Sequence, residues 1–185
     1  MPNDNLSLYF MALIPPEPFL GNARKWKEYF RDQYQSKASL NSPPHITLHM
    51  PFKLKPKRET ELVEKLQQVA STFSPFQVEL EGFGAFPPRV IFIDVQKSSE
   101  MDALQLAIKR QMKVEFQVFN ADYRERPFHP HLTLAFRDLK KDKFREAWTE
   151  FKHKEVRYTW LTPHFTLLKH DGYHWQIFRD ISFAL

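Results

Sequence analysis

Residues 43–52 read PPHITLHMPF, and polar and apolar side chains alternate through the middle of this stretch. Successive side chains of a β-strand point to opposite faces, so His45 and Thr47 share one face while Ile46 and Leu48 share the other. Such alternation is typical of a strand that is buried on one side. The stretch therefore predicts a strand that presents a titratable ring and a hydroxyl on its open face.

The same pattern returns far along the chain in residues 128–136, FHPHLTLAF, where His131 and Thr133 are again two positions apart. Strands favour threonine and branched apolar residues in any case, so a single His-x-Thr would carry little weight. Two copies, each in strand-like surroundings, are more than strand propensity alone explains. We expect the two strands to lie side by side and to bring two imidazoles and two hydroxyls into one cleft.

The order strand, helix, His-x-Thr strand, helix occurs twice along the chain. Helices are indicated where apolar residues recur every three or four positions, and strands where they alternate or form short runs. We expect an α+β fold in which residues 1–185 form one bilobal domain. Its two similar lobes of antiparallel sheet plus helices would enclose a central cleft, and each would supply one His-x-Thr strand. The expected helices cover 19–30, 62–73, 101–112 and 144–151, and the other expected strands cover 6–16, 76–86, 90–96, 158–170 and 174–183.

The composition limits the possible chemistry. Hydrophobic residues make up 42% of the 185 residues, which is enough to bury a core. Lys and Arg number 27 against 22 Asp and Glu, and the net charge of +5 suits an anionic partner such as RNA, a nucleotide or a phosphate ester. The absence of cysteine excludes disulfides, thiolate zinc sites and a cysteine nucleophile. The first residues lack the basic region of a signal peptide, and their apolar stretch is too short to span a bilayer. We expect a cytoplasmic monomer without membrane contact.

Two histidines that face one cleft suit proton transfer at a phosphodiester. One neutral imidazole accepts a proton from water or a hydroxyl, and one imidazolium donates a proton to the leaving oxygen. Both forms coexist near neutral pH because the ordinary pKa of histidine is about 6.5. We expect His45 and His131 to be this catalytic pair, in either order, with Thr47 and Thr133 holding the phosphoryl oxygens. The chemistry requires no metal and no cofactor.

The motif pair HITL (45–48) and HLTL (131–134) resembles the two-histidine (2H) phosphoesterase superfamily, and within it the 2′-5′ RNA ligase and cyclic phosphodiesterase-like branch. LYFMALIPPEP (8–18) resembles the opening strand of that family, and RPFHPHLTLAF (126–136) resembles its second motif with its upstream flank. The order of elements agrees over nearly the whole chain. The resemblance implies a bilobal α+β fold with a central cleft. It also implies hydrolysis or formation of 2′-linked phosphodiesters, often through 2′,3′-cyclic phosphates, with an RNA end or a nucleotide as substrate.

One position departs from the family pattern. Many members carry a basic residue where this chain has Phe136. Arg137 comes next, but strand alternation predicts that it points to the opposite face from Phe136. Arg124 and Arg126, just upstream of the second motif, are the other candidates for a charge that grips phosphate.

Further candidates surround the two motifs. Alternation places His49 on the face of His45, so we expect it at the rim of the cleft. Phe52, Phe128 and Tyr173 are candidates to stack on a base. The basic run KLKPKR (53–58) is more typical of a solvated loop than of an RNA-tracking patch.

Other interpretations stay open. A third match, HFTL at 164–167, comes so soon after the second that we expect His164 to lie in a structural strand. A nucleic-acid or nucleotide-binding module would keep the cleft without turnover. A metal-dependent hydrolase would use His129 and His131, since a His-x-His pair on a strand can bind a metal, although no carboxylate is arranged comparably nearby.

Overall fold

The computed structural model describes residues 6–120 and 127–184, and these form eight β-strands, four α-helices and two 3₁₀ helices. The strands pair antiparallel in one sheet with the order β6-β3-β4-β5-β2-β1-β7-β8. The α+β class expected from the sequence is therefore confirmed. The strands are β1 (Ser7–Leu13), β2 (Ile46–Leu54), β3 (Phe76–Phe86), β4 (Val90–Val95), β5 (His131–Ala135), β6 (Arg157–Thr162), β7 (His164–His170) and β8 (Trp175–Ser182). The helices are α1 (Phe19–Tyr34), α2 (Glu59–Ala70), α3 (Ser99–Phe116) and α4 (Lys141–Phe151), with the 3₁₀ helices η1 (Ala38–Asn41) and η2 (Pro56–Arg58).

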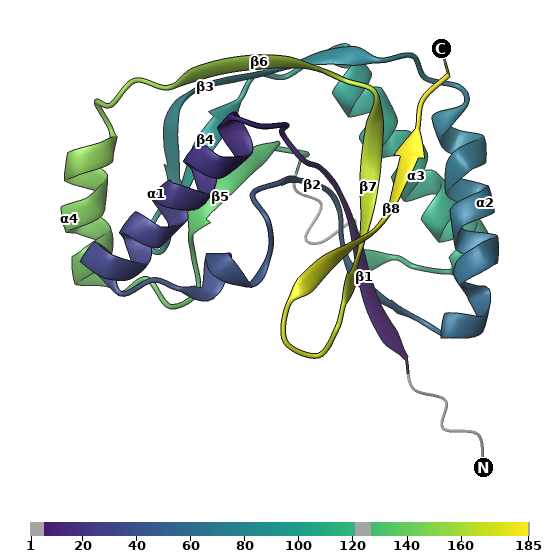
Figure 1. Ribbon diagram of the computed structural model, residues 1–185, viewed down its shortest axis with the longest axis horizontal. Helices are drawn as coiled ribbons and strands as arrows, with labels where there is room; N and C mark the ends of the chain where they lie inside the picture. The colour runs from purple at the N-terminus through teal and green to yellow at the C-terminus, as the bar shows by residue number, and fades with distance from the viewer. Residues whose placement is uncertain (1–5, 121–126, 185) are drawn as a thin grey trace.

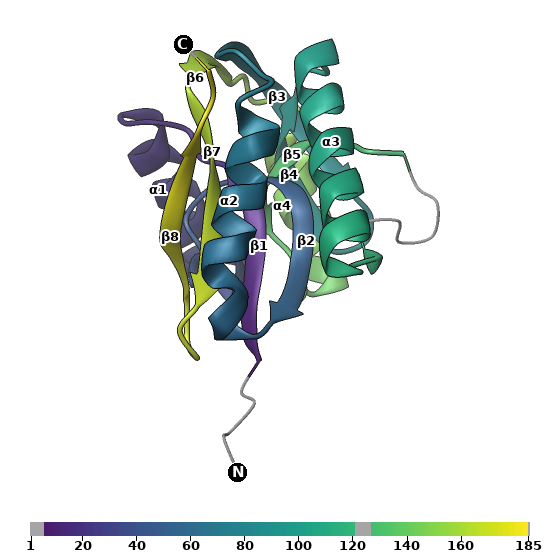
Figure 2. The same cartoon turned by 90° about the vertical axis from the view of Figure 1, so that its right-hand side faces the viewer.

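The sheet is weakest at its centre, where β2 and β5 pair only at Ile46 and Leu132. This seam separates two four-stranded halves: the β2 half contains β1, β2, β7 and β8, and the β5 half contains β3, β4, β5 and β6. In Figure 1, α1 and α4 lie on the β5 half and α2 and α3 on the β2 half, and Figure 2 shows α2 and α3 covering one face. Each half of the sheet thus contains one of the two motif strands, β2 or β5.

The two halves are interleaved in sequence. Helix α1 lies between β1 and β2 in the chain, yet it packs against β5 in the other half. This exchange brings a segment from the N-terminal third of the chain to the seam, beside the second motif.

Helix α1 is amphipathic, and the side chains that it buries recur every three or four positions. Phe30 on this face meets Phe151 of α4 at 4.8 Å between ring centroids, which ties the two helices together. Full burial of such a ring contributes about 1.5–3 kcal/mol. One member of the stripe is not apolar, because Lys27 is buried with the others. The buried positions are Phe19, Ala23, Lys27, Phe30 and Tyr34.

On the other half, α3 begins at a conventional cap. The hydroxyl of Ser98 accepts a hydrogen bond from the amide of Met101 at 3.1 Å, which satisfies one of the free amides of the first turn. Helix α2 ends at Ala70, so Phe73, which the sequence predicted to be the last residue of this helix, lies beyond it. Among the described residues, no helix has the length and apolarity that crossing a membrane requires.

The expectation of one strand over 158–170 is wrong. The segment forms β6 and β7, which belong to different halves of the sheet: β6 pairs with β3 and β7 pairs with β1 and β8. Pro163 separates them, and it has no amide hydrogen with which to continue a ladder. Its carbonyl accepts a hydrogen bond from Phe183 at 2.9 Å. The chain therefore crosses from one half to the other at this proline.

Candidate active site

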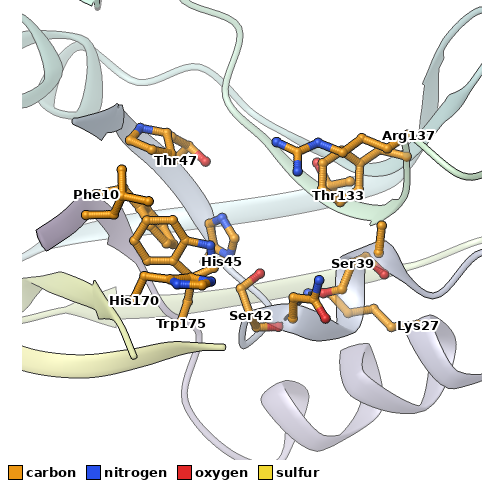
Figure 3. Close-up of a pocket in the computed structure, with 15 residues that line it drawn as sticks. Phe10, Lys27, Ser39, Ser42, His45, Thr47, Thr133, Arg137, His170 and Trp175 are labelled. Carbon is orange, nitrogen blue, oxygen red and sulfur yellow. Dashed lines mark hydrogen bonds between the residues drawn. The ribbon is translucent and has the colours of Figure 1, made fainter. Parts of the chain in front are cut away.

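A cavity of about 400 Å³ lies at the seam, and both motif strands contribute to its wall. His45 and Thr47 line it from the β2 half, and Thr133 lines it from the β5 half. Figure 3 shows His45 near the middle, with Thr47 on one side of it and Thr133 across the cavity. We call this space the Lys27 cavity, after the buried lysine in its wall.

A second cavity, of about 450 Å³, adjoins the first at Thr47, which lines both. His131 lines this second space together with the rings of Phe86 and Phe128. We call it the Phe128 cavity. The two motif histidines thus face adjoining parts of one cleft, with a motif threonine at the junction.

The ring of His45 is fixed by its own strand. Its Nδ1 lies 2.7 Å from the carbonyl oxygen of Pro43, and because a carbonyl only accepts, Nδ1 carries the proton. In the neutral ring this leaves Nε2 as the proton acceptor. Phe10 of β1 packs against the ring at 4.7 Å between centroids.

The surroundings of His45 disfavour its charged form. Burial lowers the pKa of His45 well below its ordinary value of 6.5, and the charge of Lys27 lowers the pKa further. The hydrogen bond to Pro43 opposes this effect, and the charge of His131 adds to it.

His131 is held in the same way on the other half. Its Nδ1 donates to the carbonyl of His129 at 2.8 Å, again two residues back along the chain. Phe86 and Phe92 pack against the ring, at 5.1 and 5.0 Å between centroids. Burial lowers the pKa of His131, while the charge of Asp94 raises it. Asp94 is the partner of His131 across the β4–β5 ladder.

Gly84 makes the packing around His131 possible. A Cβ at this position would lie 2.3 Å from Cε2 of Phe92, closer than nonbonded atoms can approach. A glycine in β3 therefore lets the Phe92 ring lie flat enough to support the second motif histidine.

Arg137 lines the Lys27 cavity, so the expectation that strand alternation carries it to the opposite face is wrong. Strand β5 ends at Ala135, and Arg137 adopts a left-handed backbone with φ of 58°. Alternation therefore no longer applies at this position, and both Phe136 and Arg137 border the cavity. The guanidinium lies over the Phe136 ring at 4.9 Å.

His49 does not border the cleft, and this expectation is also wrong. The β1–β2 ladder is irregular on both sides of the pair Met11–His49: β2 has one extra residue on each side, so the alternation shifts between Thr47 and His49. The His49 side chain is 1% exposed and packs edge-on against Phe52 at 5.4 Å. Its Nδ1 bonds the carbonyl of Met50, and its Nε2 is buried without a hydrogen-bond partner among the described residues.

The aromatic candidates separate in the structure. Phe128 is half-buried in the wall of its cavity, as a base-stacking residue would be. Phe52 is only 3% exposed and belongs to the core, so its expected role at the cleft is wrong. Tyr173 is 82% exposed in the turn between β7 and β8 and lines neither cavity. Arg124 and Arg126 lie outside the described residues.

The structure adds cavity residues that sequence analysis missed. Trp175 and His170 come from the β7–β8 hairpin, and Trp175 stacks edge-on against Phe10 at 4.6 Å. No local pattern in the sequence marks these three. Lys27 had a usable signal, because a lysine at a buried position of an apolar helical stripe is unusual.

The third His-x-Thr match lies apart from both cavities. His164 and Thr166 are in β7, where Thr166 donates to Oδ1 of Asp180 at 2.7 Å and His164 Nε2 is 3.6 Å from the same oxygen. Both side chains are therefore engaged by β8, as a structural strand would have them.

His129 faces Asp94, with 3.5 Å between Nε2 and Oδ1. In residues 6–120 and 127–184, no group of three or more His, Asp or Glu side chains is arranged to hold a metal ion.

The chain is similar to known proteins over most of its length. A family model described as the 2′-5′ RNA ligase superfamily matches residues 15–174. A protein of Geobacillus sp. (strain WCH70) is 25% identical over 162 residues, which cover 86% of each chain. That protein is named as a phosphoesterase by assignment. TT0787 of Thermus thermophilus matches with a TM-score of 0.68 at 20% identity, over 95% of this chain and 97% of that chain. LigT of E. coli, solved with 3′-AMP, matches with a TM-score of 0.66 at 17% identity, over 98% of this chain and 100% of that chain.

Proposed function

The chain belongs to the 2′-5′ RNA ligase superfamily, and from this premise we propose that it is a metal-independent phosphoesterase. Its substrates are 2′-linked or 2′,3′-cyclic phosphodiesters of RNA ends or nucleotides. The observation that carries the proposal is the matched pair of histidines: each donates from Nδ1 to a carbonyl two residues back, and each faces the shared cleft from its own half of the sheet.

This arrangement supports general acid–base catalysis. With both Nδ1 atoms committed to backbone carbonyls, Nε2 is the atom of each ring that exchanges protons with substrate. For hydrolysis of a 2′,3′-cyclic phosphate, one ring takes a proton from water as the water oxygen bonds to phosphorus. The other ring gives its proton to the ribose oxygen as the phosphorus–oxygen bond breaks. The protein then regains its starting state when the two rings exchange one proton through solvent.

The phosphoryl oxygens need hydrogen-bond donors while charge shifts onto them. Thr47 and Thr133 take this role from the two motif strands, and Arg137 supplies the positive charge that the Phe136 position lacks. The guanidinium fork suits phosphate oxygens.

The two substrate groups that flank the phosphorus bind in the two cavities, one in each. The Phe128 cavity is lined by Phe86 and Phe128, which suits the flat face of a base. That E. coli LigT was solved with 3′-AMP supports a nucleotide as ligand of this fold.

A single assay tests the proposal. The protein and the variants His45→Ala and His131→Ala are incubated with 2′,3′-cyclic nucleotides, with and without EDTA. We expect turnover that survives chelation and falls by about 10²–10⁴-fold in both variants. His164→Ala is the matched control, because it removes the third His-x-Thr histidine and should leave most activity.

Each other outcome points elsewhere. Nucleotide binding without turnover would favour a binding module that kept the cleft. Loss of activity on chelation would favour a metal-dependent hydrolase that uses His129 and His131. A loss in His164→Ala as large as that in His131→Ala would mean that the second catalytic strand is β7.

A further inference from the structure

Lys27 is a buried cation that the two-histidine chemistry does not use. Its side chain is 2% exposed, on the face of α1 that packs inward, and it lines the cavity that contains His45. The ammonium donates to the carbonyl oxygens of Ser39 at 2.9 Å and Ser42 at 3.1 Å. In the described part of the chain it has no carboxylate partner. Burying an ammonium without a carboxylate partner lowers the stability of the folded protein, so a functional role for Lys27 would explain its presence at this position.

The titratable side chains that line the cavity with Lys27 are basic types. Arg24 is on the same helix, and His45, Arg137 and His170 line the cavity from the position before β2, from just past β5 and from the end of β7. Asp138, three residues past the end of β5, accepts from the Ser36 hydroxyl and from the amides of residues 37 and 38. Burial, with the charge of Arg24 as a second cause, lowers the pKa of Lys27 to about 7.

The two carbonyls that Lys27 bonds belong to the segment that immediately precedes the first motif histidine. Ser42 precedes Pro43, whose own carbonyl accepts the Nδ1 proton of His45. Ser39 is also tied to the other half of the sheet, since its hydroxyl donates to the carbonyl of Leu134 at 2.6 Å. Lys27 therefore fixes the segment that orients the His45 ring and links this segment to β5, one residue from Thr133.

We propose that Lys27 is a positioning residue for His45: it fixes the carbonyl of Ser42, next to the Pro43 carbonyl that holds the ring, and its charge adds to burial in keeping the ring in the proton-accepting form. The proposal rests on the proposed function in one respect, because it assigns His45 as the general base and His131 as the general acid. The contrast with the second motif supports the assignment, since His131 faces Asp94 where His45 has Lys27 nearby.

The test follows the His45 ring directly by NMR titration of the histidine Cε1 protons, with His45→Gln used to assign its signal. We expect Lys27→Met to raise the pKa of His45 by about one pH unit, because a nearby positive charge is removed. The pKa of His131 should stay unchanged. Lys25→Met is the matched control: it removes the same charge from an exposed position on α1, and it should leave His45 unaffected.

A second measurement reports the protonation of Lys27 itself in the folded protein. In the range between pH 7 and the ordinary lysine value of 10.5, the unfolded chain holds a proton on residue 27 that the folded chain has released. The stability of the native protein should therefore rise with pH in this range, relative to Lys27→Met. Urea midpoints of the two proteins at pH 6.5 and 9.5 measure the difference.

The proposal and the proposed function can fail separately. An unchanged pKa of His45 in Lys27→Met would overturn the role of Lys27 whatever the substrate is. If the protein is active, the acidic limb of the pH profile of kcat/KM should move to higher pH in Lys27→Met by the same amount as the His45 signal. A limb that stays in place while kcat/KM falls would reduce Lys27 to structural support.

Discussion

The two motif strands hold their histidines alike but surround them differently. In both, Nδ1 donates to the carbonyl two residues back, at 2.7 Å for His45 and 2.8 Å for His131. The charge that acts on His45 is the ammonium of Lys27, which lowers its pKa, whereas on His131 the carboxylate of Asp94 raises the pKa and His129 lowers it. The comparison teaches that the motif sets ring orientation, while residues outside the motif set which ring gains or loses a proton.

The largest expected effect tests the part that the strands share. Thr47→Val and Thr133→Val each remove one hydroxyl from the cavity, and each should lower kcat/KM on a 2′,3′-cyclic nucleotide by about 10²-fold. Thr166→Val is the control, because it alters the third His-x-Thr threonine, which bonds Asp180 in β8. A loss confined to one of the two cavity threonines would show that a single half of the sheet holds the phosphate.

A packing change should separate the two histidines. Gly84→Ala places a methyl group 2.3 Å from the Phe92 ring, so the ring must move away from His131. We expect the free energy of unfolding to fall by about 1–3 kcal/mol, as for other overpacked cores, and the NMR signal of His131 to shift while that of His45 does not. Urea unfolding and the histidine spectrum provide the measurements.

Gly21→Ala is the control for this change, because the added methyl group meets only the flexible end of Glu17. Equal shifts of the two histidine signals in Gly84→Ala would indicate that the halves of the sheet do not move independently.

The smallest effect concerns the electrostatic difference. The pKa values of both histidines lie below 6.5, so the pH profile of kcat/KM should be bell-shaped, with its maximum on the acidic side of that value. Asp94→Asn removes the charge that raises the pKa of His131, so the proton on the general acid is lost at lower pH. The alkaline limb should move to lower pH, and kcat/KM at pH 7 should fall several-fold.

Asp102→Asn, at an exposed position in the first turn of α3, is the control for this charge change. If the acidic limb moved in Asp94→Asn and the alkaline limb stayed in place, His131 would be the base and the assignment of roles would be reversed.

The local sequence pattern predicted the positions of the motif residues better than those of the residues around them. The His-x-Thr spacing predicted that four side chains would face one cleft. Three of them, His45, Thr47 and Thr133, line the Lys27 cavity, and His131 lines the adjoining Phe128 cavity. The pattern failed where a strand is irregular. The register shift between Thr47 and His49 in β2 turned His49 inward, and the end of β5 turned Arg137 toward the cavity.

The sequence by itself determined the α+β class and the two His-x-Thr faces, because alternation along a strand depends only on the backbone. The tertiary structure alone decided which other side chains meet those faces. Lys27 lines the same cavity as His45 because α1 crosses to the β5 half at the seam, and Trp175 of β8 contacts Phe10 because β7 pairs with both β1 and β8. Such contacts join residues far apart in the chain, and they depend on the packing of the whole sheet.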